Sequence, residues 1–184
     1  VKTVTPSGNA QIDTAQYKFG AASGLFDGNS DSLSIAASSD FNFGTDPFTI
    51  ETWIRFNGHN RSFFIDTYPS EIMMFGITSS TGLIEVQYNY SYIINTGATP
   101  FNLNQWYHIA LSRTGTSWKV YRDGVEYVSA TNSSAFGGSS NAIGINRSGS
   151  TIELNGWLDD LRITKGVARY TSNFTPPARQ SPNK

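Results

Sequence analysis

The stretch Gly156-Trp157-Leu158-Asp159-Asp160-Leu161-Arg162-Ile163 carries the clearest fold signal in this chain of 184 residues. We interpret it as the end of a β-strand over residues 152–164. It runs into Gly166-Val167-Ala168-Arg169-Tyr170-Thr171 and then Phe174-Thr175-Pro176-Pro177. Because proline favours extended backbone, we expect residues 175–184 to form an extended exit segment.

Alternation of apolar and polar residues recurs upstream, whereas helical periodicity is absent. One strand face carries Phe48, Ile50, Thr52, Ile54 and Phe56, and the other carries Thr49, Glu51, Trp53 and Arg55. Similar runs predict strands at residues 62–67, 71–78, 83–94, 106–114, 117–122, 125–131, 142–146 and 152–164. Asp123-Gly124 lies between two of them and predicts a type I′ hairpin turn, which needs positive φ at both central positions.

The length and composition fit a single domain, and the alternation and turns make it all-β. Hydrophobic residues make up 38% of the chain and aromatic residues 14%, which is enough apolar surface for a sizeable core. We therefore predict a two-sheet antiparallel β-sandwich over residues 17–174, with one short helical turn within residues 38–43. Residues 1–16 are polar and weakly patterned, and we expect a lead-in strand or linker there.

Charge and cysteine content narrow the functional classes. The formal net charge is −1 and no Lys/Arg cluster occurs, so we expect no nucleic-acid partner. No apolar run approaches the roughly 20 residues that span a bilayer, so we expect no membrane insertion. The chain has no cysteine and many neutral polar residues. We expect an extracellular or virion-surface part, with neighbouring domains in a longer polypeptide.

Three further stretches join the closing segment in resembling one known family. They are Phe26-Asp27-Gly28-Asn29-Ser30-Asp31-Ser32-Leu33, Pro47-Phe48-Thr49-Ile50-Glu51-Thr52-Trp53-Ile54, and Trp106-Tyr107-His108-Ile109-Ala110-Leu111-Ser112-Arg113 with Val120-Tyr121-Arg122-Asp123-Gly124. Their order resembles that of laminin-G-like, concanavalin-A-like lectin-glucanase domains of bacterial extracellular and phage surface proteins. The resemblance implies jelly-roll topology. It leaves function open, because this fold serves lectins, adhesion modules, glycanases and spacers.

The sequence lacks the carboxylate pattern of the enzymes that share this fold. Laminarinase-type enzymes of this fold carry Glu-x-Asp-x-x-Glu, whereas here Glu71 is followed by Met73 and Gly76 at the positions of the other two acids. Asp159 and Asp160 cannot supply the pair, since adjacent strand residues point to opposite faces. His108 lies mid-strand, where a hydrogen-bonded structural histidine is favoured over a catalytic one.

A calcium site is one interpretation of the early loop. Asp27-Gly28-Asn29-Ser30-Asp31 spaces oxygen ligands as an EF-hand loop begins, but the rest of that motif is missing. The resemblance implies a different structural Ca²⁺ site, formed by the Gly28 carbonyl, Asp31 and Asp160. The alternative is that the loop aspartates form Asx turns and that Asp160 pairs with a nearby arginine.

Aromatic residues suggest a sugar-binding surface. Tyr88, Tyr90 and Tyr92 share one face if residues 83–94 form a single strand, and a pyranose ring stacks on such a row. The alternative is that these tyrosines pack between the sheets. Further candidate contacts are His59 and Arg61 in one loop and Phe136 in the glycine-rich loop 132–141.

Three functional hypotheses follow. The first is a non-catalytic carbohydrate-binding or cell-surface recognition module, whose partner is a glycan or host-surface polysaccharide. The second is a structural or decorative domain of a virion or phage tail fibre, without a glycan site of its own. The third, a glycoside hydrolase, is disfavoured by the missing carboxylates.

Overall fold

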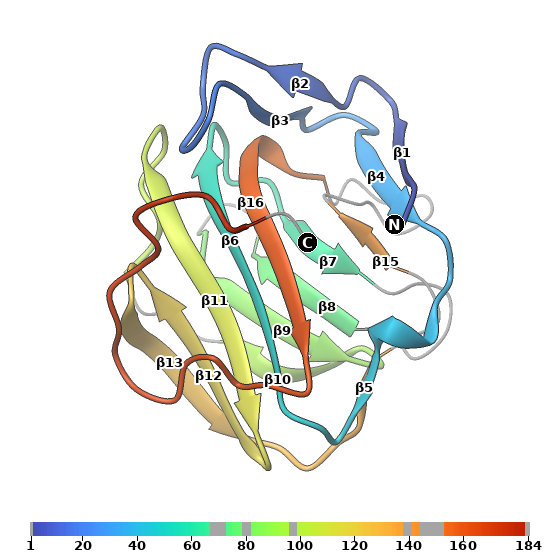
Figure 1. Cartoon of the computed structure of the whole chain (residues 1–184), viewed down its shortest axis with the longest axis vertical. Coiled ribbons are helices and arrows are strands. Elements are labelled where there is room, and N and C mark those ends of the chain that lie inside the picture. The colour runs from blue at the N-terminus through green and yellow to red at the C-terminus, as the bar shows by residue number, and fades with distance from the viewer. Residues whose placement is uncertain are drawn as a thin grey trace.

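The computed structural model describes residues 2–66, 73–78, 82–95, 99–137, 141–143 and 153–182. Two seven-stranded sheets pack face to face (Figure 1). Sheet A has the order β1 (Val4–Ser7), β4 (Ser32–Ile35), β15 (Asn141–Ile143), β7 (Ser62–Asp66), β8 (Met73–Ile77), β9 (Ile84–Tyr88), β10 (Ser91–Asn95). Sheet B has the order β13 (Val125–Thr131), β12 (Ser117–Arg122), β11 (Trp106–Thr114), β6 (Phe48–Phe56), β16 (Asn155–Lys165), β3 (Ser23–Asp27), β2 (Gln11–Asp13). The predicted two-sheet antiparallel sandwich is therefore confirmed.

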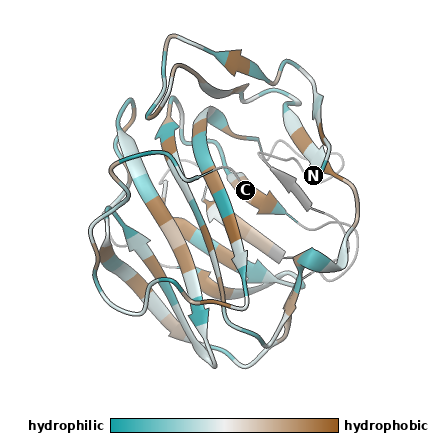
Figure 2. Ribbon diagram, viewed as in Figure 1, coloured by the Kyte–Doolittle hydropathy of each residue, from teal (hydrophilic) through white to brown (hydrophobic). Residues whose placement is uncertain are grey.

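The core lies between the two sheets and consists mainly of aromatic and β-branched side chains. Sheet B contributes Phe26, Phe48, Ile50, Ile54 and Phe56, and sheet A contributes Phe64, Phe75, Ile77, Ile84 and Val86. Figure 2 shows hydrophobic and hydrophilic bands along β11 and β16, as expected of strands that bury one face. The alternation predicted for residues 48–56 thus places its apolar set in the core.

Two predicted turns are confirmed and one was missed. Asp123 and Gly124 have φ of 51° and 79°, so both adopt the left-handed conformation that a type I′ turn requires. A 3₁₀ turn over Ser39–Phe41 is capped by the Ser38 hydroxyl. The run at 83–94 is two strands, because Asn89 and Tyr90, with φ of 46° and 64°, form a tight turn between β9 and β10.

The segments on either side of the predicted sandwich pack against it. The lead-in is not a linker: β1 pairs with β4 in sheet A, and β2 pairs with β3 in sheet B. A small third sheet pairs β5 (Asn42–Gly44) with β14 (Phe136–Gly137). After β16, residues 166–182 contain no helix or strand and cross the outer face of sheet B (Figure 1). We call this segment the strap.

Candidate functional site

A polar cluster lies on the outer face of sheet A, over β7, β8 and β9. Arg61 donates from Nε to Glu85 Oε1 at 2.7 Å and from Nη2 to Glu85 Oε2 at 3.2 Å, a two-pronged arrangement. Gln87 donates from Nε2 to the same Oε2 at 3.0 Å. The Glu85 side chain is fully buried, whereas 32% of the Arg61 side chain is exposed. The Arg61 guanidinium therefore lies at the surface and covers the buried Glu85 carboxylate with which it forms an ion pair.

The backbone below this cluster explains its shape. Gly76 lies between Phe63 and Glu85 in the strand register. A Cβ at Gly76 would come within 1.8 Å of the Ser62 carbonyl oxygen and 2.8 Å of the Phe63 ring, so only glycine fits. The Arg61 guanidinium lies 5.1 Å from the centre of the Phe63 ring, a cation–π contact. Arg61 is thus held by an anion and by an aromatic ring.

The predicted row of three tyrosines does not exist as one strand face. Tyr90 lies in the turn after β9 and is 60% exposed. Tyr92 is 51% exposed and pairs with Gln87, so it belongs to the outer face that carries the Arg61 cluster. Tyr92 also contributes, after Glu85, to raising the pKa of Arg61, although burial opposes this rise. Tyr88 instead packs against the core, so the alternative interpretation is correct for that residue.

Phe136 is not a surface contact, and that prediction was wrong. Its side chain is fully buried, and its ring centroid lies 5.3 Å from that of Phe48 and 4.7 Å from that of Trp118. The cause is a long-range pairing, because β14 binds β5 and thereby draws the start of the glycine-rich loop onto the core. The part of the loop over residues 138–140 lies outside the described residues.

His59 and Arg61 come from the same loop but differ in environment. The His59 ring packs on Phe56 at 6.1 Å, and its Nε2 is buried without a hydrogen-bond partner among the described residues. Gly82 lies against this ring, since a Cβ there would come within 2.9 Å of it. His59 therefore supports the loop, whereas Arg61 reaches the sheet face.

Gly28, Asp31 and Asp160, which the family resemblance assigned to one calcium site, do not lie close together. Asp31 accepts hydrogen bonds from the backbone of Asn9 and Asp27, whereas Asp160 accepts from the backbone and hydroxyl of Ser181. Asp27 pairs with Asn155, five residues before Asp160 on β16. At about 3.3 Å per residue, the stretch of β16 between Asn155 and Asp160 separates Asp160 from the Gly28 loop by roughly 15 Å, too far for the two to share an ion.

Of the alternative interpretation, only the part that concerns Asp27 is confirmed, because Asp31 makes no Asx turn and Asp160 binds Ser181 instead of an arginine. Asp27 accepts from the backbone of Asn29 two residues on, which is an Asx turn. Within the part of the chain that the structure describes, no group of three or more His, Asp or Glu side chains gathers as metal ligands. The residues present therefore do not fit the calcium site that the resemblance implied.

Calcium binding itself stays a prediction that melting curves can test. An ion that binds only the folded state raises the free energy of unfolding by mass action, by a few kcal/mol at roughly a hundredfold excess over Kd. The melting temperature rises as a consequence. A higher Tm in millimolar calcium than in chelator would support a site formed by other residues. Identical curves would end the idea.

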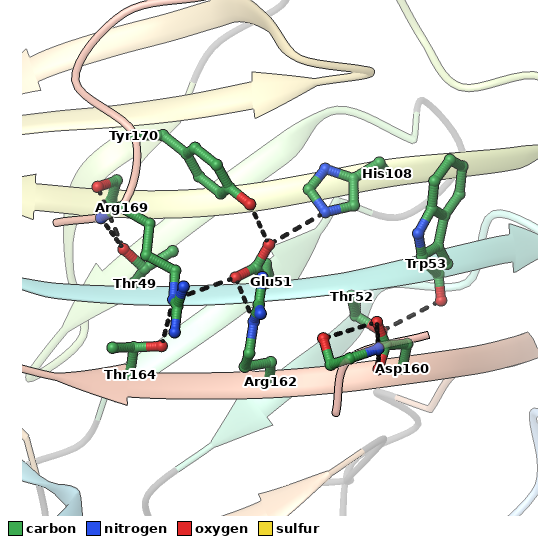
Figure 3. Close-up of polar contacts among 12 residues, drawn as sticks. Thr49, Glu51, Thr52, Trp53, His108, Asp160, Arg162, Thr164, Arg169 and Tyr170 are labelled. Atoms are coloured by element: carbon green, nitrogen blue, oxygen red, sulfur yellow. Dashed lines mark hydrogen bonds and ion pairs between the residues drawn. The ribbon is translucent and has the colours of Figure 1, made fainter. Parts of the chain in front are cut away.

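A second polar cluster fastens the strap to sheet B (Figure 3). Its centre is Glu51 on β6, which is only 2% exposed. Glu51 accepts from Arg162 Nε at 2.7 Å and from the Tyr170 hydroxyl at 2.7 Å, and His108 Nε2 lies 3.3 Å from its Oε2. His108 is 1% exposed, as expected of a structural histidine.

The electrostatics of this cluster fix the charge state of Glu51. Burial raises the pKa of its carboxyl, but hydrogen bonds from His108, Arg162 and Tyr170 and the charge of Arg162 outweigh burial and lower the pKa to about 2. For Tyr170, burial and the hydrogen bond to Glu51 raise the pKa to about 12. At neutral pH the pair is therefore a carboxylate that accepts from a neutral phenol.

Further contacts hold the strap along its length. Thr49 Oγ1 donates to the Val167 carbonyl at 3.2 Å and accepts from the Arg169 backbone at 2.9 Å. Phe174 stacks on Tyr170 with ring centroids 3.5 Å apart, and its backbone N–H donates to the Gly124 carbonyl at 2.8 Å. Ser181 ends the sequence of contacts at Asp160.

Sequence reasoning missed this cluster as a unit. Glu51 and Arg162 are 111 positions apart, and they meet because they are direct partners in the register of β6 and β16. The signal present was a charged residue at the outward positions of two strands, which by itself also fits a solvated face. A single buried carboxylate that accepts hydrogen bonds from several side chains does not supply the two-carboxylate chemistry of a glycoside hydrolase.

Glu71, the nearest match to the enzyme motif, lies outside the described residues.

Comparison with known families agrees with this architecture. A laminin G-like family model, described as the concanavalin A-like lectin/glucanases superfamily, matches residues 27–169. The chain belongs to this superfamily. The sequence resemblance is therefore confirmed, as is the sandwich that it implied.

Several solved structures share this fold at low sequence identity. Domain 4 of AbnA, a GH43 extracellular arabinanase from Geobacillus stearothermophilus, solved with arabinotriose, has a TM-score of 0.66 and 18% identity, over 91% of this chain and 83% of that one. The binding domain of Paraclostridial Mosquitocidal Protein 1 has a TM-score of 0.70 and 16% identity, over 89% of this chain and 44% of that one. A putative carbohydrate binding protein from Bacteroides ovatus has a TM-score of 0.56 and 19% identity, over 80% of this chain and 44% of that one. The lectin/glucanase-type chain thus spans less than half the length of the last two.

Curated protein sequences give no match to this lectin/glucanase-type chain. Among the residues with described structure, no helix is long and apolar enough to cross a membrane.

Proposed function

We propose that this domain is a non-catalytic, extracellular carbohydrate-binding module, and that its glycan contact surface is the outer face of sheet A around Tyr92 and Arg61. The observation that carries the proposal is an exposed tyrosine on the same sheet face as a fixed guanidinium. The C–H face of a pyranose is apolar and can cover the Tyr92 ring. Its hydroxyls need polar partners, and the exposed part of Arg61 supplies donors.

The surface is preorganised, which favours weak but specific recognition. Arg61 is held by Glu85 and Phe63, so little side-chain entropy is lost when it binds a hydroxyl. Tyr90 extends the aromatic surface at the β9–β10 turn. Both oxygens of Glu85 accept hydrogen bonds, which supports binding over acid–base catalysis at this carboxylate.

Similar structures support the same class of function. The arabinanase domain was solved with arabinotriose, and a botulinum neurotoxin binding domain with TM-score 0.65 and 17% identity was solved in complex with SialylT. These ligands belong to those proteins, and they motivate a search among oligosaccharides here. A purely structural role in a virion or tail fibre is the competing outcome, which a glycan array without any bound glycan would favour.

We expect Tyr92→Ala to weaken oligosaccharide binding at least tenfold while the melting temperature changes little, because Tyr92 is half exposed. The control is Tyr17→Ala, an equally exposed tyrosine (47%) outside sheet A, which should bind like the parent. Affinity for one sugar should be about millimolar and rise with chain length or multivalent display. Equal binding by parent and Tyr92→Ala would refute this surface.

Assays of polysaccharide hydrolysis test the proposal that the domain is non-catalytic. We expect no release of reducing ends from a broad panel of polysaccharides. Release that disappears in Glu85→Gln or Glu71→Gln would show that the domain is an enzyme and would overturn the non-catalytic assignment.

A further inference from the structure

A small hollow lies on the outer face of sheet B, on the opposite side of the molecule from Tyr92. It has a volume of about 240 Å³. Its lining consists of four hydroxyl side chains, one ammonium and one aromatic ring, namely Ser112, Thr114, Ser117, Thr171, Lys119 and Tyr170. None of these residues takes part in the proposed glycan surface.

The strand register builds the floor of this hollow. Ser112 pairs with Lys119 and Thr114 pairs with Ser117 across the β11–β12 hairpin, so all four side chains point to the outer face. Small hydroxyl residues at three of these positions leave the space empty. The strap supplies the wall, because Tyr170 and Thr171 pass beside the hairpin.

Three of the lining side chains, Ser112, Tyr170 and Lys119, are held in place by contacts within the protein. Ser112 Oγ lies 3.4 Å from Thr49 Oγ1. The Tyr170 hydroxyl donates to Glu51 (Figure 3). Lys119 Nζ donates to Glu126 at 2.7 Å and to the Thr171 carbonyl at 3.2 Å. Glu126 balances the charge of Lys119, so the hollow has no net charge to attract an anion.

We infer that this hollow is a second saccharide subsite, for one neutral sugar ring. Serine and threonine hydroxyls both donate and accept, which matches the hydroxyls of a neutral sugar. The Tyr170 ring, fixed by its stacking on Phe174, offers an apolar edge to the ring carbons. The volume suits a single small ring, being below the roughly 300–1,000 Å³ of pockets for drug-sized ligands.

This inference extends the proposed function, because it assigns glycan contact to both sheets, but it rests on separate residues. Two sites on opposite faces would let one domain hold two chains, or two parts of one polymer. Binding to a dense polysaccharide should then exceed binding to either site alone, through effective concentration.

Titration by NMR, observing backbone amides of the ¹⁵N-labelled protein, tests the subsite. The probes are the methyl pyranosides of glucose, galactose, mannose and xylose, each added to about ten times a millimolar Kd. We expect at least one probe to shift the amides of Ser112, Thr114 and Ser117. Ser117→Trp should fill the hollow and weaken these shifts at least tenfold, whereas Thr5→Trp, an exposed strand position in sheet A, should leave them unchanged.

A second variant guards against misfolding of Ser117→Trp. Thr171→Val removes one lining hydroxyl and keeps the carbonyl that accepts from Lys119, so it should also weaken the shifts. No shift of these amides with any probe, or shifts that persist in both variants, would overturn the subsite. Failure of the sheet A surface would appear instead as unchanged amides around Tyr92, so the two proposals fail separately.

Discussion

Glu51→Gln is expected to lower the free energy of unfolding at pH 7 by about 3 kcal/mol, the value that corresponds to a pKa lowered from 4.5 to about 2. The substitution keeps the shape of the side chain but removes the negative charge of Glu51. That charge pairs with Arg162 and strengthens the hydrogen bonds from His108 and Tyr170. Breaking a buried ion pair is costly because it leaves the partner charge buried and uncompensated. Urea unfolding of parent and variant measures the difference.

The contribution of Glu51 to the free energy of unfolding should decrease as the pH falls. Because the pKa of Glu51 is lower in the folded state, its contribution is fully present above about pH 4.5 and is lost as the pH falls towards about 2. The stabilities of parent and Glu51→Gln should therefore converge near pH 2. Glu126→Gln breaks the exposed pair with Lys119 and is the control, with an expected loss below about 1 kcal/mol. Equal losses for the two variants at pH 7 would contradict the buried network.

Gly124→Ala is expected to destabilise the domain by about 2 kcal/mol or more, because two penalties coincide at this position. Its φ of 79° is unfavourable for any residue with a Cβ, at roughly 1 kcal/mol. In addition, a Cβ would come within 1.9 Å of the Phe174 carbonyl oxygen, so the strap must move away from the hairpin. Overpacking of this kind typically costs about 1–3 kcal/mol more.

Gly115→Ala separates the two penalties. Gly115 also has a left-handed φ, 57°, in the neighbouring hairpin, but nothing lies within 4 Å of its would-be Cβ. Its substitution should cost only the backbone penalty, roughly 1 kcal/mol. Amide shifts of residues 173–176 should change in Gly124→Ala alone. Matching losses in the two variants would show that the strap does not press on Gly124.

Local sequence determined the strands and turns wherever the relevant interactions are short in range. The strands at 106–114, 117–122 and 125–131 were predicted with the bounds that the structure has, because alternation and the Asp123-Gly124 turn act within a few residues. The turn at Asn89 and Tyr90 was missed. Asparagine tolerates positive φ, but tyrosine rarely adopts it, so the alternating pattern was read as one continuous strand.

The candidate surface could be predicted only in part. Arg61 and Tyr92 were named from the sequence, but only the pairing of Tyr92 with Gln87 shows that the tyrosine shares a face with the Arg61 cluster. Phe136 looked like a loop residue because its environment depends on the pairing of β14 with β5, far apart in sequence.

The sequence by itself determined an all-β sandwich of the lectin/glucanase type, because the period of alternation, the turn residues and the family motifs are all written locally along the chain. The tertiary structure alone decided which charges and rings meet. Glu51 becomes a buried anchor because β16 and the strap bring Arg162 and Tyr170 to it from more than 100 positions away. Asp31 and Asp160 are also more than 100 positions apart, but there the register keeps them apart, because β16 faces the Asp27 end of β3 at Asn155 and not at Asp160. Hydrophobic periodicity specifies which face of a strand is buried, but it carries no information on which residues of distant strands become neighbours.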